Sequence, residues 1–118
     1  MNEQREFVIV FYRRETGTSP VIEFLESLKP ESLAIIHQKI HMLSAFGMQL
    51  REPHTKPIEN GLFELRIRDN KVAYRMIYFF VQGNKIIITH GFTKKTNKTP
   101  RKEIEFALKC KADYLSRN

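Results

Sequence analysis

Residues 61–93 read GLFELRIRDNKVAYRMIYFFVQGNKIIITHGFT and carry the clearest structural pattern in the chain. The stretch holds three apolar runs, at 62–68, 72–81 and 85–93, which are rich in the β-branched and aromatic residues that favour strands. Asp69-Asn70 and Gly83-Asn84 separate the runs, and both pairs are typical of two-residue hairpin turns. The stretch therefore predicts an antiparallel meander of three strands.

The two turns also predict how the strands pair, and the pairing places six residues on one face in two neighbouring rows. The outer row is Arg66, Ala73 and Lys94, and the inner row is Glu64, Arg75 and Phe92. A slip of the first pairing by one residue would send Arg75 to the opposite, apolar face, which argues against that alternative. Three cationic side chains are thus expected to converge at one end of the sheet.

Beyond these rows, both faces of the meander are apolar. We expect Ile77, Phe79, Ile86 and Ile88 on the face of the charged rows, and Phe63, Leu65, Ile67, Tyr74, Met76 and Tyr78 on the other. Helices must then cover both faces, because a sheet buries each apolar face against another layer. The charged rows are left at an end of the sheet that one helix does not cover, which describes a cleft.

The first half of the chain predicts one strand and two helices. EFVIVFY at residues 6–12 has strand composition, and Ser19-Pro20 is a cap followed by a first-turn proline, which starts a short helix. Apolar residues recur at helical spacing over 31–46, and Gly47 stands where a left-handed residue ends a helix.

The remaining segments complete an α+β fold in the order β-α-α-β-β-β-α. Residues 49–61 contain two prolines among polar residues and predict a loop, while Thr99-Pro100 predicts the cap and first residue of a C-terminal helix that ends near Ser116. We expect a four-stranded, mainly antiparallel sheet with helices packed on it. A chain of 118 residues is the size of one domain, so 1–118 is expected to fold as a single unit.

The composition predicts a cytoplasmic protein with an anionic partner. The formal net charge is +7, which favours nucleic acid, an acidic protein or an anionic membrane. The one cysteine, Cys110, excludes an internal disulfide and fits a reducing compartment. Because no apolar run is long enough to span a bilayer and the first residues are charged, we expect neither a membrane segment nor a signal peptide.

The basic residues are concentrated near the end of the chain. The run Lys94, Lys95, Lys98, Arg101 and Lys102 falls at a strand-to-helix junction, where backbone donors add to side-chain charge in attracting phosphate. Simple solvation of a helix surface also explains Lys109, Lys111 and Arg117. Likewise, ordinary cross-strand pairing with Glu64 is an alternative reading of Arg66 and Arg75.

Three motifs give the chain a resemblance to a known family. GLFELRIR at 61–68, YRMIYFF at 74–80 and HGFTKKTNKTP at 90–100 closely resemble HigB-type toxins of bacterial and phage type II toxin–antitoxin modules, within the RelE/ParE superfamily. The resemblance is strong over about 58–115, and the order of elements is also that of RelE-like proteins.

This resemblance implies a toxin that binds the ribosomal A site and cleaves messenger RNA during translation. In RelE-like enzymes the ribose 2′-hydroxyl attacks the adjacent phosphate without a metal or other cofactor, in a cleft of Arg and Lys residues. Matched motif by motif, the catalytic residues are Arg66, Arg75, Lys94 and Lys95. Cations aimed at the phosphoryl oxygens would stabilise the charge that develops there.

The proton acceptor and donor are less clearly marked in the sequence. A lysine flanked by other cations has a lowered pKa and can act as the base, so Lys94 or Lys95 is the preferred choice. His90 and Glu64 are the other candidate acids or bases, although His90 at a strand end is also typical of a packed core residue.

Further RNA contacts are assigned to Arg68, Lys56, Phe92, Lys98 and Arg101. Phe92 has two readings, as a platform for an RNA base or as a core residue. We expect no metal site, because His37 and His41, four residues apart on a helix, have no third ligand near them and read as a solvated face.

Two other functions compete with RNA cleavage. A ParE-like toxin of the same fold would bind DNA gyrase and cleave nothing, and a non-catalytic nucleic-acid-binding module would need only the net charge. The family also implies a cognate antitoxin, expected to be a helix-turn-helix protein whose docking surface is acidic.

Overall fold

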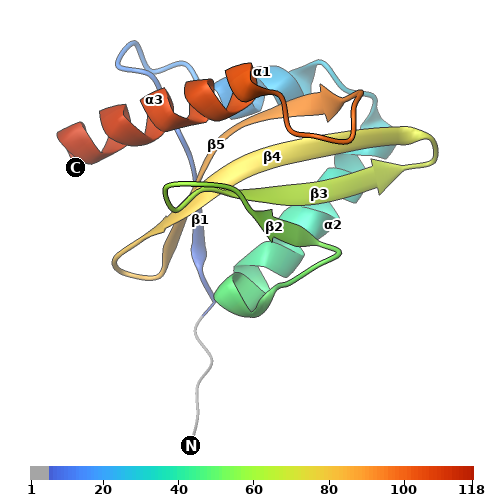
Figure 1. Ribbon diagram of the computed structural model, residues 1–118, viewed down its shortest axis with the longest axis horizontal. Coiled ribbons are helices and arrows are strands. Elements are labelled where there is room, and N and C mark those ends of the chain that lie inside the picture. Colours follow the sequence, from blue (N-terminus) through green and yellow to red (C-terminus); the bar gives the residue numbers. More distant parts are fainter. Residues whose placement is uncertain (1–5) are drawn as a thin grey trace, which may run out of the picture.

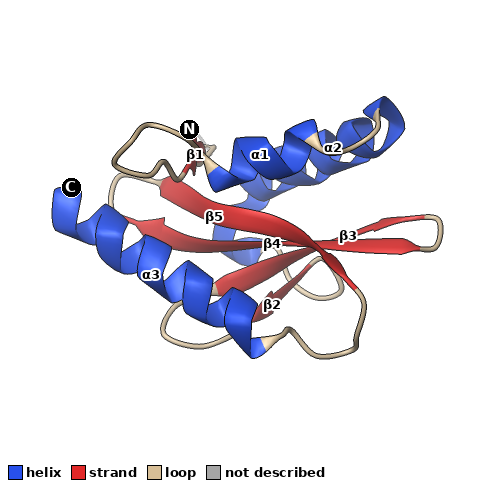
Figure 2. Cartoon of the chain, turned by 90° about the horizontal axis from the view of Figure 1, so that it is seen from above, coloured by secondary structure: helices blue, strands red, loops and turns tan. Residues whose placement is uncertain are grey.

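The computed structural model describes residues 6–118 as a five-stranded sheet with helices on both faces (Figure 1, Figure 2). In chain order the elements are β1 (Val8–Phe11), α1 (Pro20–Glu26), α2 (Pro30–Phe46), the short 3₁₀ helix η1 (Gly47–Gln49), β2 (Thr55–Pro57), β3 (Phe63–Asp69), β4 (Val72–Val81), β5 (Lys85–Lys94) and α3 (Arg101–Arg117). The strands lie in the order β1-β5-β4-β3-β2, with β1 parallel to β5 and every other pair antiparallel. The α+β class and the mainly antiparallel sheet are confirmed.

The sheet has five strands because part of the expected loop at 49–61 pairs with β3. Thr55, Lys56 and Pro57 lie opposite Leu65, Glu64 and Phe63. Pro57 is tolerated because β2 is an edge strand, where a missing backbone donor leaves no neighbour unpaired. Three residues that include a proline are too short a run to show strand alternation in the sequence.

The register of the β3–β4 hairpin differs from the expected one by two residues. Asp69 pairs with Val72, so the turn is Asn70-Lys71 and not Asp69-Asn70. Asn70 adopts the positive φ of this turn, while Asp69 stays in the strand and accepts a hydrogen bond from the Ser32 hydroxyl at 2.8 Å. A shift of two leaves each side chain on its expected face, but Arg66 now lies opposite Arg75 instead of Ala73.

The β4–β5 hairpin reaches the expected pairing at the charged end by a different route. Val81 pairs with Lys85, which makes a three-residue turn instead of the expected Gly83-Asn84 pair. A bulge next to Ile77 and Tyr78 then restores the expected partners, Arg75 with Phe92 and Ala73 with Lys94. Between the turn and the bulge, the side chains of β5 point to the faces opposite to those expected. Ile86 and Ile88 therefore pack on the α1–α2 side of the sheet and not on the α3 side.

The helices begin close to the expected residues, with one informative difference. The Ser19 side chain caps α1, as the sequence predicts, and α2 begins at Pro30. In α3, however, Pro100 is the N-cap and Arg101 the first helical residue, so Thr99 is not the cap. The Thr99 hydroxyl instead donates to the Glu64 carboxylate on β3.

Two apolar cores lie on opposite faces of the sheet, as expected. On one face α1 and α2 bury Val21, Leu25, Ile36 and Leu43 against the sheet, and on the other α3 buries Ile104, Ala107 and Cys110. Figure 2 shows α3 alone on its side of the strands. None of the helices formed by residues 6–118 is long and apolar enough to cross a bilayer.

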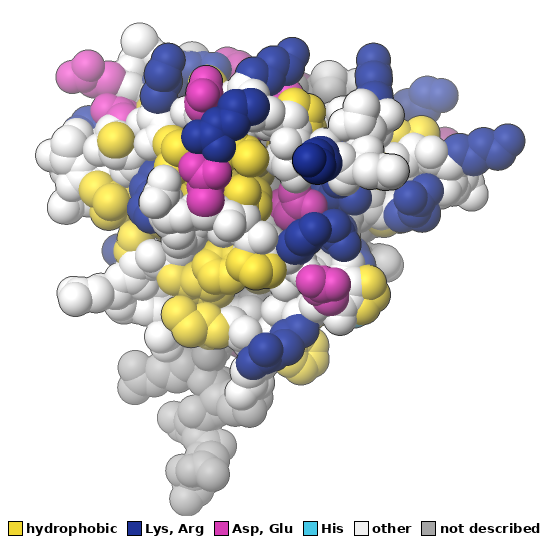
Figure 3. Space-filling view, in the orientation of Figure 1, with side chains coloured by type: hydrophobic (Ala, Val, Ile, Leu, Met, Phe, Trp, Pro, Cys, Tyr) yellow, Lys and Arg dark blue, Asp and Glu magenta, His cyan; other side chains and the backbone are white. Residues whose placement is uncertain are grey.

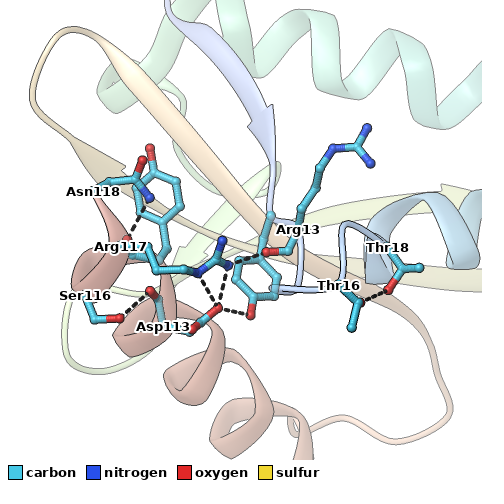
Figure 4. A network of polar contacts seen from close by, with 9 residues as sticks. Arg13, Thr16, Thr18, Asp113, Ser116, Arg117 and Asn118 are labelled. Carbon is cyan, nitrogen blue, oxygen red and sulfur yellow. Dashed lines mark hydrogen bonds and ion pairs between the residues drawn. The ribbon is translucent and has the colours of Figure 1, made fainter.

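The C-terminal end of α3 is tied to the segment that follows β1 (Figure 4). Tyr12 donates its hydroxyl hydrogen to Asp113 at 2.5 Å, and Arg117 bonds both Asp113 at 2.6 Å and the Arg13 carbonyl at 2.5 Å. These contacts hold the far end of the helix over the β1 side of the sheet. Its first residue, Arg101, is at the opposite end, beside the loop that carries Thr99.

Candidate functional site

The charged residues of β2, β3, β4 and β5 lie in three adjacent rows of the sheet, on the face that carries α3. The deepest row is Lys56, Glu64, Ile77 and His90, the middle row is Arg66, Arg75 and Phe92, and the outer row is Arg68, Ala73 and Lys94. Lys and Arg side chains gather on the side of the molecule where the β3–β4 hairpin ends and the β5–α3 loop runs (Figure 3). Arg66, Arg75 and Lys94 are therefore neighbours, although their rows differ from those expected.

Glu64 is the centre of this cluster. Its side chain is almost fully buried, at 2% exposure, and accepts three hydrogen bonds. Oε1 accepts from Nε of Arg66 at 3.2 Å and from Nε of Arg75 at 3.3 Å, and Oε2 accepts from the Thr99 hydroxyl. A buried carboxylate needs such partners, because an unpaired charge is costly away from water.

The two arginines keep part of their hydrogen-bonding capacity free. Arg75 also donates Nη1–H to the Tyr74 carbonyl at 3.0 Å. Among residues 6–118, no protein acceptor contacts Nη2 of Arg75 or either terminal nitrogen of Arg66. The side chains remain 26% and 12% exposed for Arg66 and Arg75, so solvent or an anion can reach them.

The protonation states of the cluster follow from burial and from mutual charge. Burial raises the pKa of the Glu64 carboxyl, but the hydrogen bonds from Thr99 and Arg66 lower it. The charges of Lys94 and Arg75 act in the same direction, and the pKa of Glu64 ends below its ordinary value. The carboxyl is thus ionised at neutral pH, and with three cations the cluster has a net charge of about +2.

The pKa of Lys94 is lowered by its surroundings. Burial lowers the pKa of its ammonium group, and the positive charge of Arg75 lowers it further, although Glu64 opposes both effects. Burial likewise lowers the pKa of Arg75, with Glu64 opposing, and a guanidinium remains protonated under such shifts. Lys95 lies on the loop after β5, and its side chain is exposed.

His90 lies one row deeper than Arg75 and is enclosed by protein. Its Nε2 is 3.0 Å from Oε1 of Glu103 on α3, and its Nδ1 is 3.0 Å from the Thr89 hydroxyl. The Thr89 hydroxyl donates its single hydrogen to the Ile77 carbonyl at 3.1 Å, so it faces Nδ1 of His90 as an acceptor. Burial lowers the pKa of His90, and Glu103 opposes that shift.

The other expected RNA contacts surround the cluster at different depths. Phe92 is mostly buried and stacks on His90, with ring centroids 5.5 Å apart. Lys56, Arg68 and Lys98 are exposed. Arg101 is also exposed, but its two terminal nitrogens bind Glu59 at 2.6 and 3.1 Å, so it is already paired.

The sequence does not reveal the roles of two members of this site. A Thr-Pro pair is a common helix start, so the pattern predicts Thr99 as the helix cap, and only the tertiary structure shows that it contacts Glu64. Glu103 carries no local signal, because its link to His90 joins a helix to a strand. No group of three metal-binding side chains occurs within residues 6–118, so His37 and His41 have no third ligand in the described part of the chain.

A family model for phage-derived Gp49-like proteins (DUF891) matches residues 23–112, which include every member of the three rows. The chain belongs to the Gp49-like family. Gp49-like proteins are toxin-like and are associated with toxin–antitoxin systems. A comparison with curated proteins gave no match.

Proposed function

We propose that this Gp49-like protein is the toxin of a type II toxin–antitoxin module, of the HigB type, and that it cleaves messenger RNA on the ribosome. Family membership supports the toxin role. The convergence of Arg66, Arg75 and Lys94 beside a buried carboxylate supports chemistry at a phosphate. This convergence is the observation that carries the proposal.

The proposed reaction is an attack of the ribose 2′-oxygen on the adjacent phosphorus. The new 2′-O–P bond forms as the P–O5′ bond breaks, which leaves a 2′,3′-cyclic phosphate and a 5′-hydroxyl. Negative charge on the phosphoryl oxygens rises in the transition state, and preorganised donors aimed at those oxygens stabilise it. The free guanidinium nitrogens of Arg66 and Arg75 supply such donors without further rearrangement.

Proton transfer in this reaction requires a base at the 2′-hydroxyl and an acid at the 5′-oxygen. Lys94 is the preferred base, because burial and Arg75 both lower its pKa toward the range where a neutral amine forms. Lys95, one residue further and exposed, is the alternative base or the acid. His90 is separated from solvent by its contacts with Phe92 and Glu103 and is the weaker candidate.

The test is a purified translation reaction that contains a defined message, with new 5′ ends mapped by primer extension. The wild-type protein is expected to produce ribosome-dependent cuts, and Arg75→Ala is expected to abolish them. Arg14→Ala is the matched control, since Arg14 is an exposed arginine paired with Glu23, away from the cluster. An intact message with the wild-type protein would refute cleavage.

Two other results would indicate a different function. Inhibition of DNA gyrase without RNA cleavage would indicate a ParE-like toxin. RNA binding without cleavage, with the same affinity in Arg75→Ala as in the wild type, would indicate a binding module. The basic rows favour RNA chemistry over gyrase binding, because a purely protein-binding surface does not need cations directed at one point.

The proposal includes a cognate antitoxin, expected to be a helix-turn-helix protein, whose acidic segment docks against the basic rows. Charge complementarity favours such docking and suppresses other partners. Competition between the antitoxin and RNA for the wild-type protein, weakened by added salt, is the expected result. Simultaneous binding of both would contradict docking at this site.

A further inference from the structure

Glu64 binds arginine differently from three other carboxylates in residues 6–118. Glu23, Glu59 and Asp113 each contact terminal nitrogens of Arg14, Arg101 and Arg117, respectively. Glu105 contacts Nε of Arg101, but the terminal nitrogens of that arginine are already bound to Glu59. Glu64 contacts Arg66 and Arg75 through Nε alone. A bond to Nε orients the plane of the guanidinium group and leaves its outer edge available, whereas a bond to the terminal nitrogens occupies that edge.

Glu64 also offsets an unfavourable arrangement of charge. Arg66 and Arg75 are direct partners across β3 and β4, and like charges in this relationship repel. The shared carboxylate oxygen lies between the two Nε atoms and attracts both. Without it, the two guanidinium groups would be expected to turn apart toward solvent.

The second oxygen of Glu64 reaches a different part of the chain. Thr99 lies at the end of the loop that carries Lys95 and Lys98, two residues before the first residue of α3. Its hydroxyl bond to Glu64 is the side-chain contact that joins this loop to β3. One buried carboxylate therefore connects two strands of the sheet to the lysine-bearing loop.

From these contacts we infer that Glu64 is a positioning residue, which aims Arg66 and Arg75 at the phosphate and, through Thr99, holds the lysine-bearing loop beside them. The inference rests on the proposed RNA cleavage. It assigns Glu64 no proton transfer, since the carboxylate is buried and both of its oxygens already accept hydrogen bonds.

Exchange of the Nε–H protons of Arg66 and Arg75 with water, followed in ¹H–¹⁵N spectra, measures how firmly Glu64 holds the two guanidinium groups. In Glu64→Gln these protons should exchange at least about tenfold faster than in the wild type, because the variant loses a charge-assisted hydrogen bond. Glu23→Gln is the matched control and should leave both signals unchanged. Equal exchange in wild type and Glu64→Gln would overturn the inference.

The functional consequence is a separation of cleavage from binding. Glu64→Gln should lower single-turnover cleavage by roughly 100-fold, the effect of misplacing transition-state donors. Binding to programmed ribosomes whose A-site codon carries 2′-O-methyl groups should hold or tighten, since the site gains one net positive charge. Parallel loss of cleavage, binding and melting temperature would indicate a merely structural role and overturn the inference.

The pH profile distinguishes positioning from general base catalysis. If Glu64 is a positioning residue, Glu64→Gln keeps the rising limb of the pH–rate curve, with its inflection moved to lower pH because Glu64 no longer raises the pKa of Lys94. Loss of that limb would assign Glu64 as the base and overturn the inference. Thr99→Val tests the loop contact while the Glu64 charge is kept; it should slow cleavage by about tenfold, and Thr99→Ser should restore the rate. Failure of serine to restore it would contradict the role of the hydroxyl.

The outcome for Glu64 is separate from that for RNA cleavage. If the wild-type protein neither cleaves nor binds programmed ribosomes, the proposed function fails. The exchange of the Nε–H protons still decides whether Glu64 holds the two guanidinium groups.

Discussion

Arg66 and Arg75 face each other across β3 and β4, and both donate an Nε–H to the same oxygen of Glu64. Two adjacent cations with one shared anion leave the site with an excess of positive charge and unused donors. The phosphate of the proposed RNA substrate would supply the missing negative charge. Arg75, at 12% exposure, is the more enclosed of the two and the better placed to contribute in a site shielded from water.

Replacement of Arg75 should affect cleavage more than binding. Arg75→Ala removes donors to the phosphoryl oxygens and should slow ribosome-dependent cleavage by roughly 100- to 1,000-fold. Arg75→Lys keeps the charge but lacks the Nε–H that Glu64 orients, so it should remain at least about tenfold slower than the wild type. Primer extension over time gives the rates, and full activity in Arg75→Lys would show that charge alone is sufficient.

The location of the cluster could be predicted from the sequence, but its internal arrangement could not. Alternation along the strands places Arg66, Arg75 and Lys94 on one face in both the expected and the observed register, because the two β3–β4 registers differ by two residues, which preserves the faces. The partner of Arg66 depended on which residues form the turn. In the observed turn Asp69 stays in the strand and accepts a hydrogen bond from Ser32, a contact 37 residues apart in the chain that no local pattern reveals.

The same limit explains the other differences between expectation and structure. Ile86 and Ile88 lie on the face opposite to the expected one because the turn has three residues and not two. The bulge near Ile77 corrects the pairing by one residue, so only the charged end of the hairpin has the expected partners. The roles of Thr99 and β2 arise from tertiary contacts with β3. Local propensity therefore predicted the elements, while packing between distant segments determined the hydrogen bonds of the site.

The rate of cleavage should depend on the ionisation of Lys94. A base must be neutral, so the rate should rise with pH and level off at the pKa of Lys94, which burial and Arg75 place below the ordinary value of 10.5. Arg75→Gln removes a neighbouring positive charge, which raises that pKa and should move the inflection to higher pH while the rate falls. A rate that instead declines with rising pH would identify Lys94 as a cationic stabiliser, and an unshifted inflection would assign the titration to another group.

Stability should fall in mild acid because of His90. Burial places the pKa of the folded-state imidazole below its ordinary value of 6.5, so the unfolded chain binds a proton first as the pH decreases. The free energy of unfolding is therefore highest above about pH 6.5 and is lost as the pH falls toward the folded-state pKa. Urea unfolding between about pH 5 and 7.5 should show the free energy of unfolding decreasing as the pH falls. His90→Asn should flatten this pH dependence, whatever the variant's stability at pH 7.5. His37→Asn, at an exposed position on α2, should leave the slope unchanged.

Gly47, at the end of α2, should tolerate no side chain. Its φ of 54° and ψ of −124° favour glycine, and a Cβ there would lie 2.0 Å from Cε1 of the Phe7 ring. That ring cannot move freely, because Phe7 is bonded to Ser44 through both its backbone N–H and its carbonyl and packs edge-on against Phe80.

Gly47→Ala should therefore lower the free energy of unfolding by about 3 kcal/mol, which combines backbone strain with overpacking. Gly83→Ala is the matched control: its φ is also positive, at 84°, but nothing lies within 4 Å of the added Cβ, so the loss should be only about 1 kcal/mol. Urea unfolding measures both values. Equal losses in the two variants would show that the Phe7 contact yields easily, whereas partial recovery in Gly47→Ala/Phe7→Ala would assign the difference to that ring.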